Sequence, residues 1–590
     1  MGNRLVDVYR ERLGLESGAV RKDWGGRLSV ALAYPNVYRV GMSNLGFQLV
    51  YDLLNLDERV AAERVFLPED TSSAELSPGG KGLLSMESFS PLGRFDLVAF
   101  SLSFENDYNN ILRMLDWGKI PVEQEARGDD VPLVAAGGIA VLLNPEPLAP
   151  FFDFFLLGEA EAVLQPFLDR FLESMEKTGA RKEILEDLAS CPHVYVPSLY
   201  RPRYGGEGVL EGLEPHSSSA PARIKVGKNL SMGRPGVSRI TTPETEFSGR
   251  VLVELGRGCG RSCRFCAAGY VYRPPRFRRE KELIQAVGQA LSRTGRVGLL
   301  SAAVSDTPGI EAITRSILAG GGGFSVSSLR ADSLTPGLIQ DLYRAGQRTL
   351  AIAPEAGTER LRRVINKHLS AEQLEQAVRM TAAIGEFTLR LYFMLGLPTE
   401  TNEDVAAIAD LAKQVRHWMV SESKGRGTVG RIHLSVNCFV PKPFTPFQWV
   451  PMEEASLLKD KQKRLEKALR KEGGINVGVD VPKWAYVQAL LSLGDRRAGR
   501  LLLASHRFGG DWKRAFKENE VNPDFFITRP KGLEEVLPWD MLDHGVKKEH
   551  LIEEYKLALE EKESPPCSIG RCSRCGVCPD PRSIGLPEPC

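Results

Sequence analysis

The chain has 590 residues, which at roughly 150 residues per domain corresponds to about three or four packing units. Its 43% hydrophobic and 26% charged residues are typical of folded proteins, so the composition excludes a disordered, collagen-like or simple coiled-coil chain. The 76 basic and 75 acidic residues leave a net charge of +1, which argues against nonspecific nucleic-acid binding by the chain as a whole. An anionic partner would have to be bound by a local patch.

The start of the chain and the distribution of cysteines predict a cytoplasmic protein. Residues 1–14 lack the apolar core of a secretory signal, and no apolar run reaches the roughly 18 residues of a membrane span. Seven of the ten cysteines form two groups. In a reducing compartment, clustered thiols are more often metal ligands than disulfides.

Residues 1–200 are predicted to form an α/β domain with an open, flavodoxin-like parallel sheet. Short apolar runs, such as LSVALAY at 28–34, alternate with longer amphipathic runs, which is typical of strands joined by crossover helices. Ligands of such sheets bind beyond the carboxyl ends of the strands. The polar turns expected there are 34–36, 101–107, 137–147 and 158–161. Taken singly, each turn is better explained by a structural role, such as turning the chain or starting a helix.

The rest of the chain divides into four further regions. Residues 201–245 are rich in Pro, Gly, Ser and Arg and predict a linker with a short hairpin. Residues 246–450 contain six strand candidates separated by helices, which predicts a partial (β/α)6 barrel. Residues 451–564 are predicted to be helical, and 565–590 form a cysteine-rich tail.

Two helices of the barrel region have well-marked starts. Ser370 with Gln373, and Thr401 with Asp404, have the spacing of a capping box just ahead of apolar periodicity.

The strongest chemical signal is the segment GRGCGRSCRFCAAG, which places Cys259, Cys263 and Cys266 directly after the strand RVLVELG. Three thiolates on a tight loop can hold three irons of a 4Fe–4S cluster, whereas a closed structural zinc site needs four ligands. The fourth iron is then open. The amino and carboxylate groups of S-adenosylmethionine can chelate such an iron, and a reduced cluster can deliver an electron to the sulfonium.

This CxxxCxxC spacing at the end of a first barrel strand resembles the signature of radical SAM enzymes. The resemblance implies that later segments bind S-adenosylmethionine. The segment FMLGLPTET, which includes Leu395, would contact adenine, and Gly396 and Pro398 would allow the backbone to approach closely. Glu355 would bind the ribose hydroxyls, and Arg330 would bind the methionyl carboxylate.

Two of these assignments carry an alternative or a departure from the family pattern. Arg330 and Glu355 could instead form ion pairs at the mouth of the barrel. Many family members carry a GGE-like turn after the second strand, where this chain has LLSAAVSD. Ser305 and Asp306 are therefore the candidates for contact with the methionyl amino group.

The N-terminal region resembles the cobalamin-binding-type domain of some radical SAM proteins. Residues 95–161 share its pattern of strand, GG turn, NPEP and GE-E segment, and residues 25–578 are similar to one uncharacterised subfamily. The DxHxxG loop that supplies an axial histidine to cobalt is absent, and His193 falls outside the expected position. Either a corrinoid binds without a protein histidine, or the domain contacts substrate or a partner.

The tail carries a second group of thiols, Cys567, Cys572, Cys575 and Cys578, within twelve residues. Their spacing favours an auxiliary iron–sulfur cluster, and zinc is the alternative. The remaining cysteines are interpreted as core residues at Cys191 and Cys438 and as a spare thiol at Cys590.

Arginines crowd the cysteine segment and the residues after it, interleaved with aromatic side chains. They are Arg257, Arg261, Arg264, Arg273, Arg276, Arg278 and Arg279, with Tyr270, Tyr272 and Phe277. A basic surface with interleaved aromatic side chains at the opening of the barrel could bind RNA or another anionic substrate. The alternative, which we favour, is that these arginines screen an anionic cluster or pair with acidic neighbours.

Together these observations predict an oxygen-sensitive radical SAM enzyme that generates a 5′-deoxyadenosyl radical. Methylation through cobalamin or sulfur insertion fed by the tail cluster, on RNA or protein, are the expected outcomes. A flavodoxin or ferredoxin is the expected reductant, and no membrane partner is expected. The alternative function is that of a non-catalytic iron–sulfur or corrinoid sensor.

Overall fold

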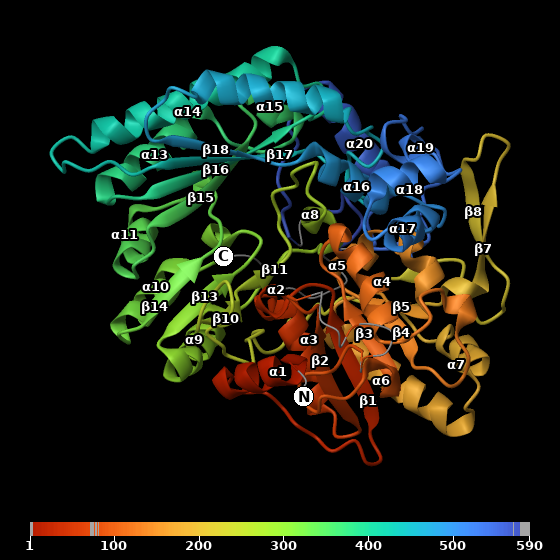
Figure 1. Cartoon of the computed structure of the whole chain (residues 1–590). Coiled ribbons are helices and arrows are strands. Elements are labelled where there is room, and N and C mark those ends of the chain that lie inside the picture. The colour runs from red at the N-terminus through yellow and green to blue at the C-terminus, as the bar shows by residue number, and fades with distance from the viewer. Residues whose placement is uncertain (1–3, 71–75, 77–79, 81, 570–571, 579–590) are drawn as a thin grey trace.

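Two α/β units face each other, and a helical C-terminal region packs against both. The computed structural model describes residues 4–70, 76, 80, 82–569 and 572–578. Figure 1 shows the N-terminal unit in red and orange, the barrel region in green and cyan, and the C-terminal helices in blue. In the described part of the chain, no helix is both long and apolar enough to cross a bilayer.

The N-terminal unit contains the predicted open sheet. Its strand order is β2-β1-β3-β4-β5-β6, with the first five strands parallel and β6 antiparallel to β5. The strands are β1 (Leu28–Tyr34), β2 (Val60–Phe66), β3 (Leu97–Ser101), β4 (Leu133–Gly137), β5 (Phe154–Leu156) and β6 (Val194–Tyr195). The order 2-1-3-4-5 is that of flavodoxin-like sheets, so the predicted fold class is confirmed.

Strand β2 is buried along its whole length, yet its sequence, VAAERVF, lacks the apolar pattern that predicts a strand. The reason is a buried charge within it. Arg64 is fully buried and donates to the carboxylates of Glu16 and Glu87, in each case at 2.7 Å. Paired burial of this kind makes a charged residue compatible with a core strand, but it removes the apolar pattern by which such a strand is recognised.

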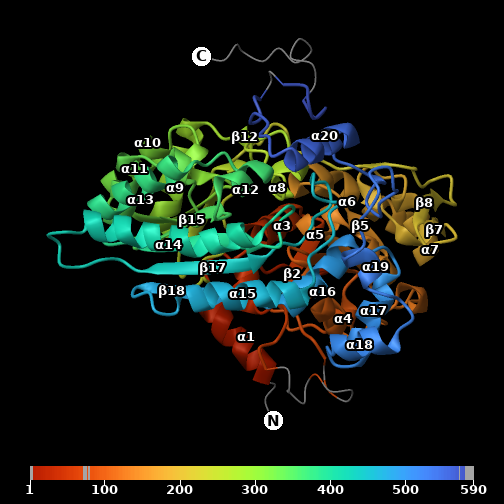
Figure 2. The same cartoon turned by 90° about the horizontal axis from the view of Figure 1, so that it is seen from above.

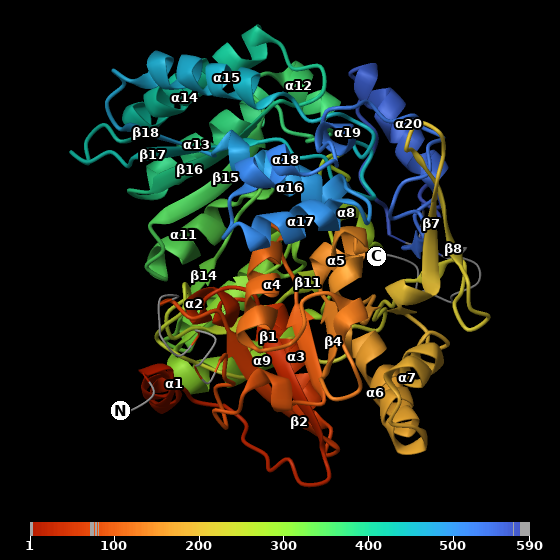
Figure 3. The same cartoon turned by 45° about the vertical axis from the view of Figure 1, so that its right-hand side comes forward.

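Helices cover both faces of the N-terminal sheet (Figure 3). They are α1 (Arg4–Leu15), α2 (Tyr38–Met42), α3 (Leu45–Leu56), α4 (Tyr108–Trp117), α5 (Ile139–Leu143), α6 (Ala160–Lys177) and α7 (Arg181–Leu188). Helix α3 begins at Asn44, whose side chain accepts a hydrogen bond from the backbone N–H of Phe47 at 3.0 Å.

The barrel region contains the six predicted strands in parallel order. They are β10 (Val251–Glu254), β13 (Arg296–Leu300), β14 (Gly323–Val326), β15 (Thr349–Glu355), β16 (Thr388–Leu395) and β17 (Ile432–Cys438). One sheet holds β10-β13-β14 and another holds β15-β16-β17, and a parallel bridge between Leu329 and Ile352 joins them. The result is a partial barrel.

A seventh parallel strand extends the barrel sheet. Strand β18 (Ile475–Val479) pairs with β17 after the crossover helix α15 (Ala455–Leu469), within the segment predicted to be helical. Its side chains alternate between exposed and more buried positions, and its fourth residue is a glycine, Gly478. An edge strand of this kind carries little apolar signal.

The helices of the barrel are α8 (Ala268–Val271), α9 (Glu280–Thr294), α10 (Ile310–Ala319), α11 (Pro336–Arg344), α12 (Glu359–Val364), α13 (Ala371–Ile384) and α14 (Asn402–Glu422). Helices α13 and α14 begin with capping boxes at Ser370 with Gln373 and at Thr401 with Asp404. Both predicted helix starts are therefore confirmed.

The linker and the C-terminal region connect the two units. Strands β7 (Tyr200–Tyr204) and β8 (Leu210–Pro215) form the expected hairpin, and β9 (Ile224–Lys225) pairs with β19 (Leu542–Asp543). The C-terminal helices are α16 (Pro482–Leu493), α17 (Ala498–Arg507), α18 (Trp512–Glu518), α19 (Asp524–Ile527) and α20 (Lys548–Leu559). Helix α17 packs against α4, and α20 packs against α12.

Candidate functional site

The segment 258–267, called here the cysteine loop, leaves the first barrel strand through a tight turn. Gly258 has a φ of +80°, and a Cβ on it would lie 2.5 Å from the carbonyl oxygen of Tyr272. The chain then returns through α8 to β12 (Arg276–Phe277), which pairs antiparallel with β11 (Gly256–Arg257). This short return holds the cysteine loop at the carboxyl end of β10.

The three thiols of the cysteine loop lie within electrostatic reach of one another. Burial raises the pKa of Cys259, and burial also raises the pKa of Cys266, to about 12. The charge of the neighbouring Cys263 thiolate contributes to both of these increases. A bound cation reverses this effect and deprotonates coordinating thiols, so the donor set suits a metal centre.

Within the described residues, no three His, Cys, Asp or Glu side chains converge on a point where one metal ion could be held. A four-iron cube does not require such convergence, because each thiolate binds a different iron. The three thiols of the cysteine loop are therefore compatible with a cluster.

Charged side chains from the loops that follow the second and third barrel strands, β13 and β14, meet the cysteine loop. Arg261 donates to both oxygens of Asp306, at 2.6 and 2.7 Å, and to Asp332 at 2.9 Å. Asp332 also accepts from Arg330 at 3.0 Å. The Ser305 hydroxyl accepts the backbone N–H of Arg330 at 3.2 Å. The structure thus brings Ser305, Asp306 and Arg330 together beside the thiols, and the Arg330 charge opposes the rise in the Cys259 pKa.

Glu355 lies at the end of β15, but it does not pair with Arg330. Its carboxylate binds the Lys367 ammonium at 3.1 Å, and Arg330 donates to the Lys367 carbonyl at 3.1 Å. The backbone of Glu355 has a φ of +69°, an unusual conformation for this residue type. Lys367, which was not predicted as a site residue, therefore links Glu355 and Arg330.

The segment after β16 packs beside the cysteine loop. Phe265 belongs to the same apolar cluster as Met394 and Leu397, whereas Leu395 is buried in the main core. Gly396 has a φ of +84°, and Pro398 is half-buried. Alternation along β16 places Met394 and Leu395 on opposite faces, whereas Leu397 lies beyond the end of the strand, after the turn at Gly396. Met394 and Leu397 belong to the predicted FMLGLPTET segment, although they were not named individually.

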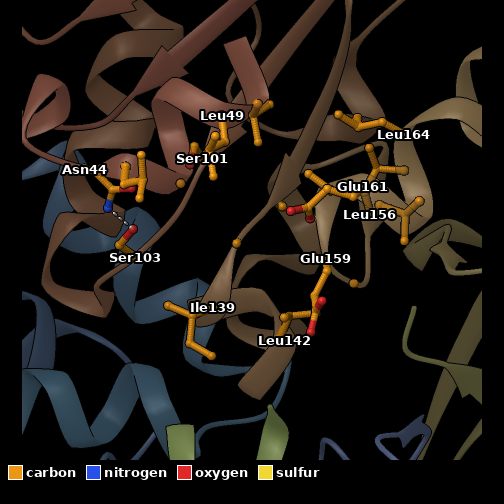
Figure 4. Close-up of a pocket in the computed structure, with 18 of the residues that line it drawn as sticks. Asn44, Leu49, Ser101, Ser103, Ile139, Leu142, Leu156, Glu159, Glu161 and Leu164 are labelled. Atoms are coloured by element: carbon orange, nitrogen blue, oxygen red, sulfur yellow. Dashed lines mark hydrogen bonds between the residues drawn. The ribbon is translucent and has the colours of Figure 1, made fainter. Parts of the chain in front are cut away.

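A cavity of about 580 Å³ lies between the N-terminal sheet and the cysteine loop (Figure 4). Ser101, Gly137 and Gly158, at or just beyond the ends of β3, β4 and β5, form one wall. Gly258, the first residue of the cysteine loop, and Tyr272, which follows the loop, form part of the other wall. Three of the polar turns predicted from the sequence, 101–107, 137–147 and 158–161, contribute to this lining. His193 does not line the cavity, and it contacts the Lys225 carbonyl instead.

Glu159 joins the two units at the edge of this cavity. It is buried and accepts hydrogen bonds from Arg257 at 2.8 Å and from Arg276 at 2.6 and 3.0 Å. Glu161 and Glu254 pair with Arg257 as well, and Glu254 also pairs with Arg278. The GEAE turn therefore has a structural role in holding the N-terminal unit against the barrel.

Most of the crowded arginines are occupied within the protein. Arg257, Arg261, Arg264, Arg276 and Arg278 form ion pairs with acidic residues. Arg273 binds Ser262, Gly269 and His550. The side chain of Arg279 is 87% exposed. Arg279 also pairs with Glu282, at 3.9 Å. Pairing with acidic neighbours, the interpretation favoured from the sequence, therefore holds for six of the seven arginines.

The tail thiols lie against the cysteine loop. The backbone N–H of Cys567 donates to the Gly260 carbonyl at 2.7 Å, and the backbone N–H of Lys547 donates to the Cys575 carbonyl at 2.9 Å. Burial, together with the charges of the other three tail thiols, raises the pKa of Cys567 to about 11. Cys191 and Cys438 are buried and separate, as predicted, and Cys590 lies outside the described residues.

Two regions of the chain match known protein families. Residues 46–197 match the family described as radical SAM proteins, N-terminal, and residues 253–412 match the radical SAM superfamily. The uncharacterized protein MJ0966 of Methanocaldococcus jannaschii is 29% identical over 476 residues, which are 80% of this chain and 90% of that protein.

Two solved structures are similar at low sequence identity. The radical S-adenosylmethionine methyltransferase TsrM of Kitasatospora setae, with tryptophan substrate and a SAM analogue bound, is 14% identical, with a TM-score of 0.41. The match covers 69% of this chain and 72% of TsrM. The cobalamin-dependent S-adenosylmethionine radical enzyme OxsB, with aqua-cobalamin bound, is 13% identical, with a TM-score of 0.44. That match covers 82% of this chain and 67% of OxsB.

Proposed function

We propose that this chain, which is a radical SAM protein with an N-terminal domain of the associated family, holds a 4Fe–4S cluster at Cys259, Cys263 and Cys266 and cleaves S-adenosylmethionine reductively. The observation that carries the proposal is the set of three mutually interacting thiols on one loop, with Arg330 and Glu355 beside them. When bound, the reduced cluster supplies the electron that yields a 5′-deoxyadenosyl radical.

The protein's part is to bind and orient S-adenosylmethionine. The Nε and Nη2 atoms of Arg330 are fixed by Asp332 and the Lys367 carbonyl, whereas Nη1 makes no hydrogen bond to the described part of the chain. We assign Nη1 to the methionyl carboxylate. Glu355 is assigned to the ribose hydroxyls, and the segment around Leu397 is assigned to adenine.

The cavity between the two units is the proposed place for the reacting part of the substrate. It reaches from the cysteine loop to the strand ends of the N-terminal sheet, where parallel sheets bind ligands. For the substrate class, RNA or protein, the paired arginines offer little support, because only Arg279 among them is largely exposed. Anaerobic affinity purification, followed by analysis for RNA and for protein, tests that part of the proposal.

A second candidate function adds a corrinoid to the same cavity and makes methyl transfer the outcome. The favouring observation is the lining, in which Gly137, Gly138 and Gly158 expose backbone among apolar side chains. No histidine belongs to this lining, so a corrinoid would be held without a protein nitrogen on cobalt. A corrinoid absorption spectrum in anaerobically purified protein is the expected result. A protein that stays free of corrinoid after incubation with cobalamin would contradict this candidate.

The central proposal is tested by measuring 5′-deoxyadenosine. Reconstituted, reduced protein incubated with S-adenosylmethionine is expected to form it, and a Cys263→Ala variant is the control. Formation no greater than in that control, with an intact cluster in the wild-type protein, would eliminate the enzyme and favour a sensor.

A further inference from the structure

The cysteine tail covers the outer side of the cysteine loop. Its Cys567 N–H donates to the Gly260 carbonyl at 2.7 Å, and a Cβ built on Gly260 would lie 3.7 Å from the Cβ of Cys567. Because consecutive Cα atoms are about 3.8 Å apart, the Cβ of Cys567 lies within about 9 Å of the Cα of Cys259. Two groups of thiols that are about 300 residues apart in the sequence are thus neighbours.

Buried hydrogen bonds fix the tail in this position. The side chain of Asn366, which is fully buried, donates to the Ser262 carbonyl and to the Ser564 hydroxyl, in each case at 3.1 Å. It also accepts the Ser564 N–H at 2.9 Å. A single amide therefore connects the cysteine loop to the residues that lead into the tail.

A buried ion pair provides a second connection. Glu554 on α20 accepts from Arg264 of the cysteine loop at 3.1 Å and from Arg574 of the tail at 2.8 Å. Arg264 and Glu554 are almost fully buried. Arg574 stands directly before Cys575, so the carboxylate holds one residue of each cysteine group.

Arg273 stands between the two groups. Its guanidinium donates to the Ser262 hydroxyl at 2.8 Å. Burial lowers the pKa of Arg273, but Tyr270 and the nearby thiols of Cys575 and Cys567 outweigh this effect and raise it. A guanidinium beside sulfur ligands favours the more reduced, more negative state of a cluster.

Part of the cysteine loop is buried beside these contacts. Ser262 is 5% exposed and Arg264 is fully buried, whereas Cys259, Gly260 and Cys266 are half-buried. Figure 2 shows the tail beside α20 and β12 at the rim of the molecule. A cluster held by the tail would therefore lie beside the cysteine loop, on the side where Cys567 meets Gly260.

We propose that Cys567, Cys572, Cys575 and Cys578 hold a second iron–sulfur cluster that passes single electrons to the cluster of the cysteine loop. The inference rests on the proposed function, since it assigns the electron route of that site. A low-potential one-electron carrier of the flavodoxin or ferredoxin class reduces the tail cluster, which is reoxidised as it reduces the other cluster by one electron. No bond forms or breaks and no proton moves in this step.

The test uses full-length protein reconstituted anaerobically with iron and sulfide. A Cys572→Ser/Cys578→Ser variant removes two tail ligands, and Cys191→Ser serves as the matched control because Cys191 is an isolated core thiol. The tail variant is expected to contain about half the iron and sulfide of the wild-type protein. Electron paramagnetic resonance of the reduced wild-type protein is expected to show magnetic coupling between two clusters, and the coupling should disappear in the tail variant.

The second readout is the rate at which reduced flavodoxin reduces the remaining cluster, followed by stopped-flow absorbance. The tail variant should be reduced at least tenfold more slowly, and the Cys191→Ser control should match the wild-type protein. A melting temperature close to wild type establishes that the variant is folded. If it is not folded, Cys567→Ser is used, because the backbone hydrogen bond to Gly260 does not need the thiol.

Three results would overturn the proposal: zinc in place of iron in the tail, an unchanged iron content in the variant, or an unchanged rate of reduction. Failure of the proposed function gives a different pattern. In that case the wild-type protein forms no 5′-deoxyadenosine, while coupling and electron transfer between the two clusters persist.

Discussion

The two cysteine segments differ in how they are held. The cysteine loop is continuous with a barrel strand and returns through a helix and a two-stranded ribbon, so its shape is set by regular structure around it. The tail from Ser564 to Cys578 has no helix or strand in its described residues. It is held by side chains of other elements, chiefly Asn366, Glu554 and Arg273.

This difference indicates a division of labour. The proposed radical chemistry needs side chains that are held rigidly around the cysteine loop. The barrel supplies this support, because Asp306 and Asp332 bind Arg261 and the Lys367 carbonyl binds Arg330. The tail takes its position from the loop that it covers. Changes in the cysteine loop should therefore disturb the tail, whereas changes in the tail should leave the loop in place.

The largest effect is expected from single alanine substitutions of the thiols. Cys259→Ala, Cys263→Ala and Cys266→Ala should each lower 5′-deoxyadenosine formation at least 100-fold, because the cluster that supplies the electron is lost. Cys578→Ala should lower it no more than about tenfold when dithionite is in excess. Liquid chromatography of the product measures both. Equal losses in the two segments would remove the distinction between them.

Glu554→Gln should detach the tail and leave the barrel intact. Removing one partner of a buried ion pair costs roughly 3–5 kcal/mol, and Arg264 pairs with no other acidic side chain in the described residues. Limited proteolysis should cleave the variant near residue 564 much faster than the wild-type protein. Glu553→Gln, at an exposed position of the same helix, is the control and should be cleaved at the wild-type rate.

Glu159→Gln should weaken the contact between the N-terminal unit and the barrel. We expect a loss of about 2–3 kcal/mol in the free energy of unfolding, less than for Glu554, because Arg257 retains Glu161 and Glu254. Chemical denaturation measures it, with the exposed Glu176→Gln as the control. A loss below about 0.5 kcal/mol would mean that this ion pair does not hold the units together.

The smallest effect concerns pH and the contact between the C-terminal region and α5. Burial and, to a lesser extent, the Lys228 charge lower the pKa of His544 from 6.5 to about 3. The unfolded chain then binds a proton that the folded protein does not, so stability falls as the pH drops from about 6.5 towards 3. At pH 5 the loss is about 2 kcal/mol. His544→Gln should reduce the difference in stability between pH 7.5 and pH 5 by that amount in urea titrations, and an unchanged pH dependence would contradict it.

The sequence predicted those parts of the molecule in which local pattern and chemistry coincide. Apolar alternation located most strands, capping boxes located two helix starts, and the spacing of Cys259, Cys263 and Cys266 located the cysteine loop. The sequence pattern did not show which residues of the FMLGLPTET segment face the cysteine loop: Leu397 shares an apolar cluster with Phe265, whereas Leu395 lies in the main core.

Contacts across long sequence separations could not be predicted. Nothing in the composition indicates that Cys567 meets Gly260, that Glu159 meets Arg276 or that Lys367 joins Glu355 to Arg330. Each depends on packing of elements that are far apart in the chain. Buried charges such as Arg64 also obscure the strand that carries them, because their partners lie elsewhere.

The most direct test of the account is whether the cluster of the cysteine loop has an open iron. Reduced protein with the tail ligands removed should show a changed electron paramagnetic resonance spectrum when S-adenosylmethionine is added, with nitrogen and carboxylate coupling from its methionyl group. An intact cluster whose spectrum does not respond to S-adenosylmethionine would contradict the account.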